Sequence, residues 1–88
     1  MSYADRIDRF NNLKLEQKMT VIRLVGAPLN LTRNAGPRVV HLYALGSAYV
    51  DVYHNQSGTV VDAMAFGDVE RINDYLKKLD ISDVFKSG

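Results

Sequence analysis

The stretch RVVHLYALGSAYVDVYHNQSGTVVDAMAF, from Arg38 to Phe66, contains three runs rich in β-branched and aromatic residues. Such runs are typical of strands, and the residues between them, Gly46-Ser47 and Asn55–Gly58, are typical of tight turns. Strands joined by turns this short pair with their neighbours in antiparallel order. The stretch therefore predicts a three-stranded antiparallel meander.

The first turn fixes how the first two strands pair. Glycine at the first position of a two-residue turn over Gly46-Ser47 is favourable hairpin chemistry. This turn predicts the pairs Leu45 with Ala48, Tyr43 with Val50 and His41 with Val52. A three-residue loop is the alternative, and it would move every side chain of one strand to the opposite face.

The second turn is predicted to be a type I turn over Asn55–Gly58, followed by a bulge. Continued along the strands, this register pairs His54 with Val60, Val52 with Asp62 and Val50 with Met64. One predicted face then carries Ala48, Val50, Val52, His54, Val60, Asp62, Met64 and Phe66. The other carries Tyr49, Asp51, Tyr53, Val61, Ala63 and Ala65, and both faces are substantially apolar.

Two helices are predicted before this sheet. Residues 2–5 have the form of a capping box, which starts a short helix ending near Asn12. Leu15, Met19 and Ile22 recur at helical spacing in a second helix, which Gly26 ends. The β-branched run over 20–25 leaves a strand there as the alternative. Residues 27–37 are predicted to be a loop, with room for a short edge strand around 29–32.

A third helix is predicted after the sheet, with Asp68 as its cap. Its apolar stripe consists of Val69, Ile72, Leu76 and Leu79, and Lys77 and Lys78 in its last turn suit the helix dipole. A final turn would return Ile81, Val84 and Phe85 to the core.

The predicted fold is a single small α+β domain over residues 1–88. It consists of a three- or four-stranded antiparallel β-meander, one or two N-terminal helices, and a C-terminal helix packed on one face. A chain of 88 residues has a small core and no cysteine with which to reinforce it. Association with a second copy, as a homodimer, is the expected source of further stability.

Charge is divided unevenly along the chain. Residues 1–44 hold seven bases and three acids, whereas residues 45–88 hold four bases and seven acids, giving +4 and −3. This division suits either an anion-binding patch or the docking of two copies. The chain has no apolar run long enough to span a membrane, and its N-terminus is charged, so we expect a cytoplasmic protein without membrane contact.

Asp51 is the strongest candidate for binding, because Tyr49 and Tyr53 flank it on one strand face. An acid between two aromatic rings suits recognition of a cation or of a partner's arginine. If helices cover only one face of the sheet, the other exposes an apolar patch of the kind that marks an interaction site. We therefore expect a non-enzymatic interaction or regulatory module, which binds itself or another protein through that face or an edge strand.

A small-ligand or catalytic site is the alternative. His54 and Asp62 are predicted to be diagonal neighbours, with His41 nearby and with Arg33 and Arg38 available for an anionic group. The chain shows no positioned nucleophile, no tight metal-ligand spacing such as HExxH and no glycine-rich phosphate loop. We therefore expect neither a metal nor a cofactor. The near-neutral net charge and the absence of an RNP-type sequence argue against nucleic acid.

Overall fold

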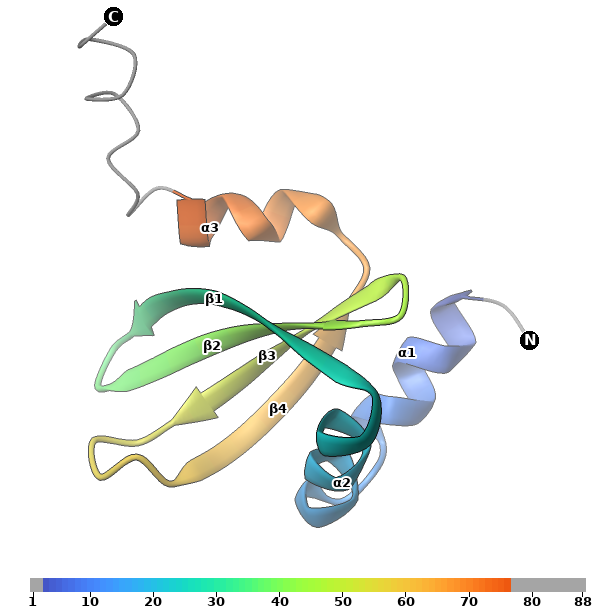
Figure 1. Cartoon of the computed structure of the whole chain (residues 1–88), viewed down its shortest axis with the longest axis horizontal. Helices are drawn as coiled ribbons and strands as arrows, with labels where there is room; N and C mark the ends of the chain where they lie inside the picture. Colours follow the sequence, from blue (N-terminus) through green and yellow to red (C-terminus); the bar gives the residue numbers. More distant parts are fainter. Residues whose placement is uncertain (1–2, 77–88) are drawn as a thin grey trace, which may run out of the picture.

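The computed structural model describes residues 3–76. Two helices, α1 (Tyr3–Asn11) and α2 (Leu15–Val25), precede four strands, β1 (Gly26–Ala35), β2 (Arg38–Leu45), β3 (Ala48–His54) and β4 (Val60–Phe66). The strands form one antiparallel sheet in the order β1-β2-β3-β4 (Figure 1). The predicted α+β meander is confirmed, with four strands and two N-terminal helices.

The chain after the sheet begins with a 3-10 turn, η1 (Val69–Ile72), followed by the short helix α3 (Asn73–Leu76). The Asp68 side chain accepts a hydrogen bond from the Glu70 backbone N–H at 2.9 Å, so Asp68 is a cap as predicted. The expected helix is therefore described only to Leu76. The predictions for Lys77, Lys78, Leu79, Ile81, Val84 and Phe85, and for Ser2 at the other end, lie outside the described residues.

Residues 20–25 belong to helix α2, which ends where Gly26 begins β1. The Gly26 N–H donates to the Ile22 carbonyl, and a Cβ at Gly26 would lie only 2.6 Å from that oxygen. Only glycine, which has no Cβ, allows the backbone at residue 26 to lie this close to the Ile22 carbonyl as the helix ends.

Segment 27–37 was predicted as a loop with a short edge strand around 29–32. The edge strand is present but much longer, because most of the segment forms the ten-residue strand β1, and the predicted loop is wrong. Leu29, Asn30 and Leu31 bulge out opposite Leu42, between the pairs Pro28 with Tyr43 and Thr32 with His41. Asn30 has a φ of 58° in this bulge. An edge strand tolerates proline and bulges because one side of its backbone has no strand to pair with.

The predicted register of the first hairpin is confirmed. Leu45 pairs with Ala48, Tyr43 with Val50 and His41 with Val52. Gly46 has a φ of 62°, a conformation in which a side chain at the first turn position would be strained.

The second hairpin follows the prediction only next to its turn. His54 pairs with Val60, but Tyr53 pairs with Asp62, so Val61 is an extra residue in β4. Beyond this bulge Val52 faces Ala63 and Val50 faces Ala65, one residue away from the predicted partners. Because side chains alternate along a strand, Asp62, Met64 and Phe66 lie on the opposite face from the one predicted.

We name the two faces after β3: the valine face carries Val50 and Val52, and the tyrosine face carries Tyr49, Asp51 and Tyr53. Helices α1 and α2 cover part of the valine face, whose buried cluster is Phe10, Ile22, Val50, Val52, Ala63 and Ala65. The buried cluster of the tyrosine face is Val40, Leu42, Phe66 and Tyr75, and Tyr75 comes from α3. Helices α1 and α2 therefore pack against one face and the short segment η1–α3 against the other, whereas one face was expected to be uncovered.

Candidate functional site

Asp51 lies in the interior instead of on an exposed binding face. Its side chain is 1 % exposed, and three other side chains donate hydrogen bonds to its two oxygens. The Tyr75 hydroxyl donates to Oδ1, while Nη2 of Arg33 and Nη2 of Arg71 lie 3.2 and 3.1 Å from Oδ2. A carboxylate held in this way is not available to a partner.

Aromatic rings surround the two arginines. Nη2 of Arg33 also donates to the Tyr53 hydroxyl at 3.3 Å, and its guanidinium lies 5.5 Å from the centre of the Tyr75 ring. The Arg71 guanidinium lies 4.5 Å from the centre of the Phe66 ring, which stacks on Tyr49 at 5.8 Å. These contacts join β1, β3 and β4 to η1 and α3. We call Asp51, Arg33, Arg71, Tyr53 and Tyr75 the Asp51 cluster.

The pKa shifts agree with this reading. Burial raises the pKa of the Tyr75 hydroxyl, and the hydrogen bond to Asp51 raises it further. Burial alone would lower the pKa of the Arg33 guanidinium, but the hydrogen bond and charge of Asp51 outweigh it, and the pKa is raised. Tyr75 therefore stays neutral and Arg33 stays charged. Through the Asp51 cluster, Arg71 of η1 and Tyr75 of α3 bind Asp51 of β3, so these contacts hold η1 and α3 against the sheet.

The predicted pair of His54 and Asp62 is not brought together. Because of the bulge at Val61, Asp62 lies on the tyrosine face, where its carboxylate accepts from the Ala63 N–H at 2.8 Å and lies 3.8 Å from Lys18 Nζ. The described residues include no hydrogen bond or ion pair between His54 and Asp62. His54 contacts His41 instead, with 4.6 Å between ring centroids.

The remaining predicted residue, Arg38, is exposed at the start of β2. It lines an open depression together with Pro37, Asn55, Gln56 and Ser57, away from the Asp51 cluster. Over residues 3–76 no three His, Asp or Glu side chains gather as a metal site. A cavity of about 180 Å³ lies between α1 and the β2–β3 turn, lined in part by Ile7, Phe10 and Leu45. Pockets for small molecules are generally larger, about 300–1,000 Å³.

The outer edge of β4 is closed by side chains. The Asn11 amide donates to the Ala65 carbonyl at 3.0 Å and accepts from the Ala65 N–H at 2.7 Å, as a neighbouring strand would. Lys18 Nζ donates to the Ala63 carbonyl at 2.7 Å, and Asp62 occupies the Ala63 N–H. Sequence analysis missed Asn11 and Lys18. Lys18 lies four residues before Ile22, and this spacing placed it on the buried side of the helix.

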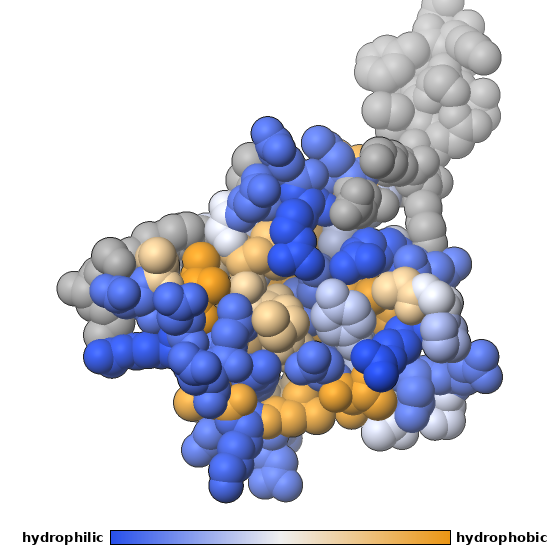
Figure 2. All heavy atoms as spheres, turned by 180° about the vertical axis from the view of Figure 1, so that it is seen from behind, coloured by the Kyte–Doolittle hydropathy of each residue, from blue (hydrophilic) through white to orange (hydrophobic). Residues whose placement is uncertain are grey.

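At the other edge of the sheet, β1 contacts α2 and α3, and among residues 3–76 no side chain closes it with hydrogen bonds of the kind found at β4. Next to it lie the three exposed apolar side chains of Leu24, Val25 and Leu29, which are 77 %, 64 % and 37 % exposed. Leu24 and Val25 end α2, and Leu29 follows in β1. We call these three residues the corner surface. On the face of the molecule drawn in Figure 2, hydrophilic side chains separate the apolar areas from one another.

Comparison with known proteins gave no match to a family model, to a curated protein or to a solved structure. None of the helices described over residues 3–76 is long and apolar enough to cross a membrane.

Proposed function

We propose that this protein is a non-enzymatic interaction module that forms a homodimer in the cytoplasm through its corner surface. The exposure of Leu24, Val25 and Leu29 carries this proposal. Single exposed apolar residues are common, but three of them within six residues of chain are costly to leave in water. The occupant we propose is a second copy of the chain, with each corner surface packed on the other.

The two sheet edges favour this corner over other positions. Unpaired edge strands invite association, and proteins cover the edges that must stay single. Side chains of Asn11, Lys18 and Asp62 hydrogen-bond to the β4 edge, whereas over residues 3–76 no such bonds close the β1 edge. Association is therefore expected at β1, next to the corner surface.

The form of β1 favours a closed dimer. Pro28 and the bulge at Leu29–Leu31 interrupt the strand, so that an added strand cannot pair along its whole length. Side-chain packing about a two-fold axis, by contrast, uses the same surface on both copies. No such surface is then left for a third copy, so the assembly is a closed dimer. A stable interface buries roughly 1,200–2,000 Å² in total, so the first half of β1 must contribute along with the corner surface.

Sedimentation equilibrium on the purified chain tests this proposal. We expect Leu24→Glu and Val25→Glu to weaken association at least about tenfold, because each places a charge in an apolar interface. Both side chains are exposed, so circular dichroism should report an unchanged fold.

Val39→Glu is the matched control, because Val39 is an exposed apolar residue on β2 and lies outside the corner surface. It should associate like the parent. A parent that is monomeric at high micromolar concentration, or a dimer that only Val39→Glu weakens, would contradict the proposal.

The alternative of a small-ligand or catalytic site at His54 and Asp62 gains no support from the geometry. Asp62 is engaged by Lys18 and the Ala63 N–H, and His54 by His41.

A further inference from the structure

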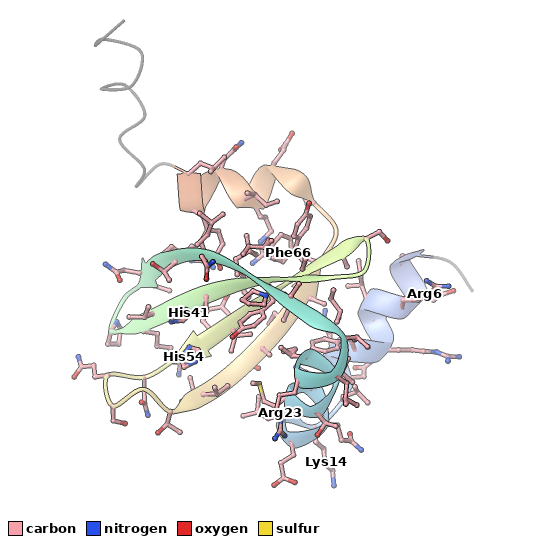
Figure 3. All side chains as sticks on the ribbon, viewed as in Figure 1. Arg6, Lys14, Arg23, His41, His54 and Phe66 are labelled. Atoms are coloured by element: carbon pink, nitrogen blue, oxygen red, sulfur yellow. The ribbon has the colours of Figure 1, made fainter. Side chains whose placement is uncertain are left out.

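The only two histidines of the chain lie in contact on the valine face. His41 pairs with Val52 and His54 pairs with Val39, so the two are diagonal neighbours on β2 and β3. Their ring centroids are 4.6 Å apart and the ring planes are inclined by 71°. Both rings are half-buried, and Figure 3 shows them toward the end of the sheet that lies away from α1.

One of these rings lacks a polar partner. Nδ1 of His54 is buried and has no hydrogen bond within the described part of the chain. An unpaired buried polar atom costs about 1–3 kcal/mol, and a bound ion or water removes this cost. Asp62 does not supply it, because its carboxylate is directed to Ala63 and Lys18.

The spacing of the rings suits a shared metal ion. Nitrogen ligands lie about 2.0–2.1 Å from such an ion, so two imidazoles in adjacent coordination positions have ring centres roughly 4.5–5.5 Å apart. The observed 4.6 Å falls in this range.

We propose that His41 and His54 together bind one divalent transition-metal ion of the class that prefers imidazole, namely Cu²⁺, Ni²⁺ or Zn²⁺. The described residues place no third His, Asp or Glu side chain beside this pair. Affinity follows the usual order for nitrogen sites, with Cu²⁺ bound most tightly. This site is independent of the corner surface.

Titration of the full, tag-free chain with Zn²⁺, followed by NMR of both imidazole rings, tests the proposal. The two rings should shift along one binding curve that saturates at a single ion per chain. A shift of only one ring, or saturation at half an ion per chain through bridging of two copies, would overturn it. This readout uses the unaltered protein, so it does not depend on a variant that folds.

Calorimetric titration with Cu²⁺ gives the second test. His41→Gln and His54→Gln should each weaken binding by at least about tenfold, because one imidazole cannot replace two. Since the chain has no other histidine and no cysteine, neither variant retains an equivalent site. A variant that binds Cu²⁺ as tightly as the parent would show that the ion is bound elsewhere.

Discussion

Asp51 is the residue on which the packing of the tyrosine face depends. A buried carboxylate is tolerated only when its charge and its hydrogen-bonding capacity are both met. Here Arg33 and Arg71 supply opposite charge, and Tyr75 supplies a neutral donor. Because Tyr75 and Arg71 come from the end of the described chain, Asp51 links that end to the middle of the sheet.

Asp51→Asn should therefore destabilise the protein by about 2 kcal/mol, the usual worth of hydrogen bonds to a charged group. Urea unfolding measures the change. Asp62→Asn is the matched control, because its carboxylate is 48 % exposed and its ion pair with Lys18 is long, at 3.8 Å. It should cost less than about 1 kcal/mol. Equal costs for the two variants would contradict the role given to Asp51.

The raised pKa of Tyr75 predicts that the folded protein loses stability at alkaline pH. Its pKa is raised in the folded state above the ordinary value of 10.0, so the folded protein keeps a proton that the unfolded chain loses. The contribution is fully present below pH 10 and is lost as the pH rises further. Absorbance titration of tyrosinate should show a tyrosine that resists ionisation. Tyr75→Phe should remove that resistant group, and its persistence in the variant would contradict the assignment.

At the scale of the elements, β4 depends on helix α1 for the cover of its edge. Asn11→Ala removes both hydrogen bonds to Ala65, so we expect a loss of about 1–3 kcal/mol and faster amide exchange at Ala65. Asn12→Ala is the matched control, because Asn12 is exposed one residue further on. It should change stability by less than about 0.5 kcal/mol. If Ala65 exchanges at the same rate in both variants, Asn11 does not close the edge.

The elements also differ in how far the sequence predicted them. Helix α2 and the first hairpin were predicted because apolar spacing and Gly46 act locally. The predicted register of β4 was wrong by one residue because nothing in the sequence distinguishes Val61, the extra residue of the bulge, from its neighbours. Strand β1 was predicted as a loop because Pro28 and Asn30 suit loops and sheet edges alike.

The candidate site was predicted in part for a similar reason. Alternation along β3 correctly placed Asp51 with Tyr49 and Tyr53 on one face. Its burial was not predictable, because Arg71 and Tyr75 lie at least 20 residues away along the chain. Only the tertiary fold brings them to the carboxylate.

Across the whole molecule, the opposite charges of the two halves meet within one chain. Lys18 and Arg33 belong to the basic half, and they contact Asp62 and Asp51 of the acidic half. Some of the opposite charges of the two halves therefore pair within one chain. The proposed association between two copies rests on apolar contacts instead. The dissociation constant of the dimer should change little between about 0.05 M and 1 M salt, conditions that strongly alter screening. Sedimentation at both salt concentrations checks this, and steep weakening by salt would indicate charged docking instead.

Amide hydrogen exchange at two protein concentrations tests the central claim most directly. At high concentration the dimer should protect residues 24–31, and dilution should remove that protection while residues 60–66 of β4 exchange unchanged. This result would place the interface at the corner surface. Exchange that is independent of concentration at residues 24–31, or protection that appears only in β4, would contradict the proposed dimer.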